Sequence, residues 1–349
     1  MSASTFINIE SSVINGIPLV TRVSNIARLG GIGNPNSTRA LLELKPPSDG
    51  VLKKAILSLF VSGKDLTAGF RWKVKYCGIT LSREFRPQIT ISSGNQSHAA
   101  LVFDITPIIL RNSAKHEVNI AYDGIYPITI DSITILALYE HKDTLSSMSY
   151  KVGVELLEPN KSTTLTMNLD TVVENNASLM LSYYIPSRSS ALQVSVNGRA
   201  IGTFYGSVGV DEIETLVENP NTTNKITLTH LSKTEHTNPI RVLEAILMSI
   251  KMKKPDFNVE IIEVKPNDYI KMRIENIGEA KPDNVLLVAL SRGFPFYKCN
   301  LRRLIPGEEM EIKIPYNIIR HRPFIIRIVW TKAGKTFFKD TKINLQFTS

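Results

Sequence analysis

The chain has 349 residues, of which 43% are hydrophobic and 21% charged, and its formal net charge is +9. This composition excludes global disorder, and no apolar run approaches the roughly 18–20 residues needed to cross a bilayer. The first 20 residues lack a basic start followed by a continuous apolar stretch, so we expect no secretory signal. A cytoplasmic location is the default expectation, with processing or export by another route as the alternative.

Short β-strands are predicted throughout the first 145 residues. Residues 1–40 are rich in Ser, Asn and Gly and predict an irregular lead-in strand and loop. Val51–Val61 is apolar on both faces in its second half, as expected of a central strand. Phe70–Tyr76 then alternates: Phe70, Trp72, Val74 and Tyr76 lie on one side and Arg71, Lys73 and Lys75 on the other, which is the period of a half-buried strand. Strands of this length and spacing predict a β-sandwich or jelly roll over 1–145.

A second module is predicted over 146–255, after a polar linker at His141–Ser149. Ala177–Gly198 repeats the pattern of Ala55–Gly78: an apolar run, a short polar connection, strict alternation and a final Gly. We therefore predict that the second module is a duplicate of the first. Both modules resemble jelly-roll, galactose-binding-like domains in outline, but no sugar-binding motif can be matched residue by residue.

A third module is predicted over 256–349, after the charged linker KMKKPD at 251–256. A strand ends in the motif ENIGE at 275–279, and a PGE turn at 306–308 leads into an alternating strand. These turns resemble those of CARDB-type (cell-adhesion-related) immunoglobulin-like sandwiches of archaeal and bacterial surface proteins. The resemblance covers about 90 residues. It implies an immunoglobulin-like fold and transfers no functional residue.

The densest acidic cluster in the sequence could hold a structural calcium ion. It contains Asp211, Glu212 and Glu214, and jelly-roll loops are a common place for such carboxylates. The EF-hand pattern is absent, however, and the spacing of Glu214 and Glu218 also fits a short helical turn with a solvated face. The two interpretations stay open.

Four arginines of the third module could form a site for an anion or a partner. They are Arg302, Arg303, Arg320 and Arg322. An ordinary solvated surface is the alternative. Nucleic acid is disfavoured as a partner, because the positive charge is spread thinly along the chain.

No catalytic or metal motif is found. Histidines at the spacing H-x-x-x-H, a C-x-x-C pair and G-x-S-x-G are all absent, and His230 and His236 only flank a loop. Cys77 and Cys299 fall in different predicted modules, so no disulfide within a module is expected.

We therefore expect a non-enzymatic, all-β protein that binds a protein partner or assembles with itself, as in a filament, surface or virion component. One alternative is an array of carbohydrate-binding modules, which predicts an aromatic platform involving Tyr183, Tyr184 or Tyr205. Another is a sandwich-fold hydrolase, which predicts carboxylates converging in a cleft.

Overall fold

The structure is a computed structural model that describes residues 5–47, 49–64, 66, 71–109, 113–234, 237–265, 268–315 and 324–343. All regular elements of the described residues are β-strands, which confirms the all-β prediction. Residues 1–46 and 50–251 belong to one compact unit, and 252–349 belong to a second. The boundary between the units lies within the charged segment 251–256.

The first sandwich consists of two antiparallel sheets. The larger has the order β2-β10-β4-β8-β7, with β2 at Gly16–Leu29, β10 at Ile128–Glu140, β4 at Val51–Gly63, β8 at Gln96–Asp104 and β7 at Ile89–Ser93. The smaller has the order β3-β9-β5-β6, with β3 at Ser37–Glu43, β9 at Lys115–Asp123, β5 at Arg71–Tyr76 and β6 at Ile79–Ser82.

The second sandwich is built in the same way. Its larger sheet has the order β1-β11-β18-β13-β16, with β1 at Ile7–Ile14, β11 at Thr144–Leu157, β18 at Ile240–Met252, β13 at Asn176–Ile185 and β16 at Gly209–Glu218. Its smaller sheet has the order β12-β17-β14-β15, with β12 at Ser162–Asn168, β17 at Thr223–Ser232, β14 at Ser190–Val196 and β15 at Arg199–Phe204.

Leaving β1 and β7 aside, the two sandwiches have one topology. If the eight remaining strands of each are numbered in chain order, both have sheets 1-8-3-6 and 2-7-4-5. This is the arrangement of an eight-stranded jelly roll. The two similar sequence segments form the third and fourth strands of each copy, although residues 65 and 67–70 of the first lie outside the described part. The shared topology therefore favours the predicted duplication.

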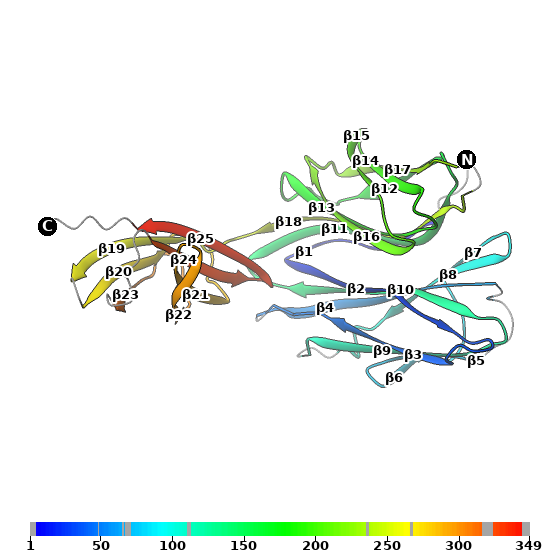
Figure 1. Cartoon of the computed structure of the whole chain (residues 1–349), viewed down its shortest axis with the longest axis horizontal. Coiled ribbons are helices and arrows are strands. Elements are labelled where there is room, and N and C mark those ends of the chain that lie inside the picture. Colours follow the sequence, from blue (N-terminus) through cyan, green and yellow to red (C-terminus); the bar gives the residue numbers. More distant parts are fainter. Residues whose placement is uncertain are drawn as a thin grey trace. The chain divides into compact units, whose positions relative to one another are not determined.

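The larger sheets of the two jelly rolls face each other, so the unit has four layers of strands (Figure 1). A buried cluster joins both sheets and includes Ile56, Phe60, Leu136 and Leu138 of the first jelly roll with Met148, Tyr150, Leu243 and Ile246 of the second. Strands β4, β10 and β18 are consequently buried on both faces over most of their length. This explains their nearly continuous apolar sequences.

The predicted linker at His141–Ser149 is wrong over its last six residues. Thr144–Ser149 is the first part of β11, and Ser146, Ser147 and Ser149 are buried. The Ser146 hydroxyl donates a hydrogen bond to the Gly16 carbonyl at 2.5 Å. Small hydroxyl side chains can be buried at low cost when the backbone bonds them, and this makes a buried strand look polar in sequence.

The N-terminal strand connects the two jelly rolls. β1 pairs with β11 of the second sandwich, whereas β2 pairs with β10 of the first. Residues 7–14 therefore lie in a sheet of the second module, although the sequence assigned them to the first, and they are a regular strand rather than an irregular lead-in. Asn25 adds a further link, because its side chain pairs with both the N–H and the C=O of Val210 on β16, at 2.8 Å each.

In the described part of the second unit, seven strands form a sandwich. One sheet has the order β19-β20-β23, with β19 at Phe257–Lys265, β20 at Tyr269–Asn276 and β23 at Glu309–Pro315. The other has the order β22-β21-β24-β25, with β22 at Phe294–Leu301, β21 at Asn284–Ser291, β24 at Phe324–Lys332 and β25 at Lys335–Ile343. This division of seven antiparallel strands is immunoglobulin-like, as predicted.

Candidate functional site

The C-terminal sandwich has an outer sheet face that is apolar although it points away from the core. Side chains at 285, 287 and 289 of β21 belong to the core, so the alternate ones point outward. The outward residues are Leu286, Val288 and Leu290 on β21 and Ile325 and Val329 on β24. We call these five residues the apolar face. Leu286 is the cross-strand neighbour of Val329, and Leu290 that of Ile325. These four side chains are half-buried, whereas Val288, between the two pairs, is only 8% exposed.

One charged pair lies within the apolar face, because Arg327 is the cross-strand neighbour of Val288. Arg327 on β24 donates two hydrogen bonds to Asp340 on β25, at 2.7 Å from Nε to Oδ1 and 2.8 Å from Nη2 to Oδ2. Its guanidinium carbon is also 4.5 Å from the ring centre of Phe338, which is 61% exposed. The hydrogen bonds from Arg327 hold the pKa of Asp340 below its usual value. Arg327 therefore brings no uncompensated charge to the surface.

The opposite sheet of the same sandwich has an ordinary, charged outer face. Lys271 pairs with Glu311 at 2.6 Å between Nζ and Oε2, and Arg273 pairs with Glu309 at 3.4 Å between Nε and Oε2. An outer face with alternating charges is what a solvated antiparallel sheet requires. The contrast within one sandwich makes the apolar face an unusual feature rather than a property of the fold.

The sequence analysis did not single out the apolar face, although a signal was present. Val285–Leu290 is an unbroken apolar run, whereas a sheet with one solvated face should show alternation. The same signal in β4 and β10 marks strands covered by the other jelly roll. Applied to β21, it would have predicted an outer face that is covered by protein.

Two of the four predicted arginines can be placed, and they have different surroundings. Arg302 forms an ion pair with Glu308 and donates a hydrogen bond to the Glu309 carbonyl at 2.9 Å. Arg303 lines a shallow pocket of about 440 Å³ with Leu286 and Val329, so it lies at one end of the apolar face. The other two, Arg320 and Arg322, lie outside the described residues, and the four-arginine site stays a prediction.

The predicted acidic cluster lies on strand β16, so the expected helical turn between Glu214 and Glu218 is wrong. Alternation puts Asp211 on one face of the strand and Glu212 and Glu214 on the other. Glu212 pairs with Arg22 at 2.5 Å, and Glu214 accepts a hydrogen bond from Ser178 at 3.2 Å. Among the described residues, no group of three or more His, Cys, Asp or Glu could hold a metal ion. Calcium stays an untested prediction.

The remaining predicted residues separate into buried and exposed positions. His230 is fully buried, and its Nδ1 donates to the Leu157 carbonyl at 2.8 Å, while His236 lies outside the described residues. Tyr183 is buried and Tyr205 is 75% exposed. The ring of Tyr184 lies under the Arg241 guanidinium, 3.9 Å from its central carbon. The three tyrosines therefore do not form one platform.

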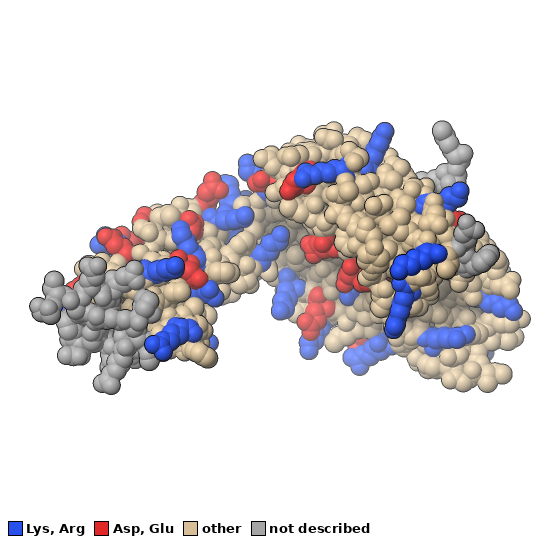
Figure 2. Space-filling model, turned by 45° about the horizontal axis from the view of Figure 1, so that its top comes forward, with Lys and Arg blue, Asp and Glu red and all other residues tan. Residues whose placement is uncertain are grey.

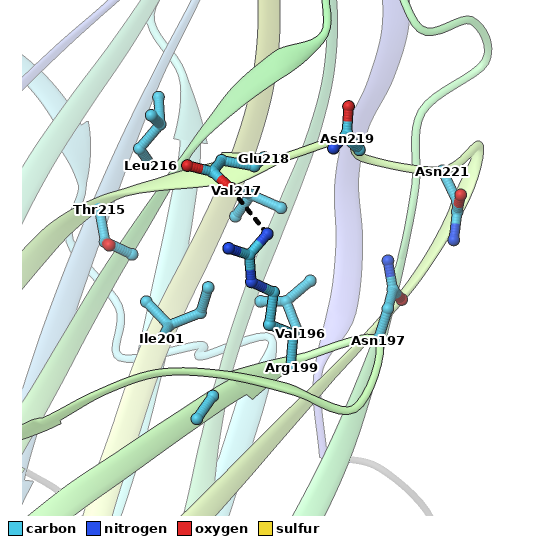
Figure 3. A pocket seen from close by; sticks show the side chains of 11 residues that line it. Val196, Asn197, Arg199, Ile201, Thr215, Leu216, Val217, Glu218, Asn219 and Asn221 are labelled. Carbon is cyan, nitrogen blue, oxygen red and sulfur yellow. Dashed lines mark ion pairs between the residues drawn. The ribbon is translucent and has the colours of Figure 1, made fainter.

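The second jelly roll also has an open cleft of about 380 Å³ beside its edge strands β15 and β16. Figure 3 shows Arg199 and Glu218 facing each other across it, with 2.7 Å between Nη1 and Oε2. Asn197, Asn219 and Asn221 add polar groups around the rim. The Asn197 side chain is already bonded to Asn224 and to the Lys225 backbone, which leaves fewer polar groups for a ligand.

Positive charge is not concentrated on the face of the molecule that Figure 2 shows. Lys and Arg side chains are spaced across it, with Asp and Glu among them. None of the described residues forms a helix that is long and apolar enough to cross a membrane.

Comparisons with known proteins do not assign the chain to a family. No protein-family model matches the chain, and no curated protein matches it. Among solved structures, a β-glucuronidase from Ruminococcus gnavus matches with a TM-score of 0.22 and 12% identity, over 57% of this chain and 35% of that one. The glycoside hydrolase domain of Endo-D from Streptococcus pneumoniae matches with a TM-score of 0.21 and 9% identity, over 57% of this chain and 33% of that one. The chain spans about a third of the length of these structures, and likenesses this weak carry no argument about activity.

Proposed function

We propose that this protein is an assembly subunit that docks onto a second copy of itself through the apolar face of its C-terminal sandwich. The single observation that carries the proposal is the aliphatic surface formed by Leu286, Val288, Leu290, Ile325 and Val329. Contiguous apolar surface on a soluble domain marks sites of protein contact. Jelly rolls and immunoglobulin-like sandwiches are common in assembled structures, which agrees with this role by analogy of fold.

The first unit already contains a contact of the kind that we propose, in which one sheet packs on another. In the first unit, two sheets that are apolar on their outer faces pack on each other and bury Arg–carboxylate pairs between them. The C-terminal sheet has the same two ingredients, an aliphatic face and the pair formed by Arg327 and Asp340. Sheet-on-sheet docking of two such faces is thus a contact that this protein already uses.

A second copy is the occupant we favour because the face is self-complementary in charge. A two-fold contact brings the same patch together twice, so any unpaired charge on it would meet its own kind. Here Arg327 is already neutralised by Asp340. Lys298 on β22 and Lys342 on β25 border the aliphatic residues, as cross-strand neighbours of Val288 and Ile325. Docking centred on the aliphatic residues leaves these two lysines at the rim, where their long side chains keep the ammonium groups in water.

The test is the mass of the full chain in solution, measured by size-exclusion chromatography with light scattering. We expect the wild-type chain to be a dimer or larger and Val329→Glu to be a monomer, because the carboxylate would be buried without a partner. Ile262→Glu is the matched control, since Ile262 is 40% exposed on β19 of the other sheet of the same sandwich. This control should keep the wild-type mass.

A wild-type chain that stays monomeric at high concentration would exclude docking between copies. Equal loss of assembly in both glutamate variants would place the contact elsewhere. Circular dichroism and thermal melting of the two variants show whether each is folded, so a lost assembly can be separated from a lost fold.

A further inference from the structure

A polar pocket opens between the two jelly rolls, and it is separate from the apolar face. Its volume is about 370 Å³, at the small end of the range of roughly 300–1,000 Å³ for ligand pockets. The first jelly roll contributes wall residues from β4, β8 and β10, and the second contributes residues from β11, β13 and the start of β18. The pocket therefore exists only because the two jelly rolls of one chain pack against each other.

Three buried polar side chains form the floor of this pocket. Arg241 donates from Nη1 to Asp131 Oδ2 at 3.0 Å and to His98 Nδ1 at 2.9 Å. The exposed fractions are only 6% for Arg241, 3% for Asp131 and 8% for His98. Because groups of this kind are expensive to bury, a cluster of them at the base of a pocket is a feature to be explained.

The hydrogen bonds fix the roles of these groups. A guanidinium can only donate, so Nδ1 of His98 accepts and the proton of the neutral ring is on Nε2. Burial, followed by the nearby Arg241 charge, lowers the pKa of His98 to about 4, so the ring is neutral near pH 7. Asp131 compensates the charge of Arg241, with 3.4 Å between its Oδ1 and Nη2, and its carboxylate also accepts a hydrogen bond from the Ser62 side chain. The floor thus offers both donors and acceptors without net charge.

The upper walls add neutral groups that can donate and accept. Gln96, Thr129 and Asn238 line the pocket with two amides and a hydroxyl. A charged ligand would find no unpaired countercharge here, and an apolar ligand would leave these polar groups without partners. A ligand whose own groups both donate and accept, and which carries no charge, matches this lining.

We propose that the pocket between the jelly rolls binds a neutral, hydroxyl-rich ring of the size of one pyranose. In this arrangement Asp131 Oδ1 accepts a hydrogen bond from one ligand hydroxyl. The amides of Gln96 and Asn238 form hydrogen bonds with further hydroxyls at the mouth of the pocket. This site is independent of the docking proposed for the apolar face, because it lies wholly within the first unit.

The experiment is calorimetric titration of the full chain with the methyl glycosides of glucose, galactose, mannose and xylose, and with glucuronate as an anionic comparison. At least one neutral glycoside is expected to bind, and more tightly than glucuronate. Thr129→Ala and Asn238→Ala should each weaken that binding about tenfold, which corresponds to about 1.4 kcal/mol. Thr215→Ala is the control, since Thr215 lines the separate cleft of Figure 3 and the affinity should not change.

Failure of every neutral glycoside to bind overturns the proposal, as does preferred binding of glucuronate. If Thr215→Ala weakens binding while Thr129→Ala and Asn238→Ala do not, the sugar site is the cleft beside β15 and β16 instead. Val329→Glu should leave the affinity unchanged, so that failure of this proposal and failure of the assembly proposal give different results.

Discussion

Arg22 on β2 and Glu244 on β18 form a buried ion pair between the two jelly rolls, with 2.5 Å between Nη2 and Oε1. The Glu244 side chain is fully buried and also accepts hydrogen bonds from Thr134 at 2.6 Å and from Tyr150 at 2.7 Å. Four strands, β2, β10, β11 and β18, thus meet at one carboxylate. Because both oxygens of this carboxylate are bonded, its burial costs less than that of an unpaired charge.

We expect Glu244→Gln to destabilise the first unit by about 3 kcal/mol, because it leaves the Arg22 charge buried with its main counterion removed. The measurement is urea-induced unfolding followed by tryptophan fluorescence and circular dichroism. Glu212→Gln is the matched control, since Glu212 also pairs with Arg22 but its side chain is 59% exposed. Glu212→Gln should lower the free energy of unfolding by about 1 kcal/mol or less. Similar losses in the two variants would contradict the role given to Glu244.

The four-layered packing predicts how fragments of the chain behave. Residues 1–251 should fold alone and melt in one cooperative transition, because the two larger sheets share a core. Residues 1–145 should not, since the surface of β4 and β10 that includes Phe60 and Leu136 would face water. Scanning calorimetry and binding of a hydrophobic dye test this. A soluble 1–145 fragment with a sharp transition would show that the jelly rolls are independent.

Acid should destabilise the interface between the jelly rolls through His98. Its pKa is lowered to about 4 in the folded state, from about 6.5 when unfolded. Between these values the unfolded chain binds a proton that the folded chain does not, so the free energy of unfolding falls as the pH falls. Across this pH range, His98 lowers the free energy of unfolding by about 3 kcal/mol in total. Arg241 and Asp131 face the ring, and the raised pKa of Asp131, caused by burial, opposes part of this loss.

The comparison that isolates His98 is His98→Asn, whose amide oxygen can still accept from Arg241. Burial also lowers the pKa of His116 and His230, so the wild-type protein loses stability in acid for several reasons. Urea unfolding at about pH 7 and about pH 4.5 should show a smaller acid loss in His98→Asn. Equal acid losses in the two proteins would show that His98 does not carry the effect.

Much of the fold could be predicted from the sequence because one face of most strands meets a core and the other meets water. Trp72, Val74 and Tyr76 are buried and alternate with exposed or half-buried basic residues, as expected. The prediction failed where strands have two buried faces. Ser146 and Ser147 looked like a linker because nothing local shows that a hydroxyl is bonded to a distant backbone.

The candidate sites were harder to predict, for a different reason. Arg241 is 110 residues from Asp131 and 143 residues from His98 in the sequence, so no motif spacing connects the three residues. They meet only because two copies of one fold are docked. The apolar face did have a local signal, the unbroken apolar run of β21, but its meaning depends on knowing which faces the sandwich itself covers.

The two jelly rolls contain equivalent hairpin turns that predict a stabilising substitution. Cys77-Gly78 and Asn197-Gly198 each have positive φ at both residues, namely 43° and 86° in the first turn and 53° and 83° in the second. Such two-residue turns favour Asn-Gly. In the first turn Cys77 Sγ accepts the Glu117 N–H at 3.4 Å, and in the second Asn197 Oδ1 accepts the Lys225 N–H at 2.9 Å. Cys77 Sγ thus occupies the position at which the second jelly roll has a stronger hydrogen-bond acceptor, Asn197 Oδ1.

We therefore expect Cys77→Asn to stabilise the first unit by about 0.5–1 kcal/mol, and the reciprocal Asn197→Cys to destabilise it by a similar amount. Both effects arise from the same two causes, the ease with which Asn adopts positive φ and the strength of an oxygen acceptor. The free energy of unfolding in urea under reducing conditions is the measurement. If Cys77→Asn is destabilising while Asn197→Cys is neutral, the two turns are not equivalent, and the duplication would not extend to this level of detail.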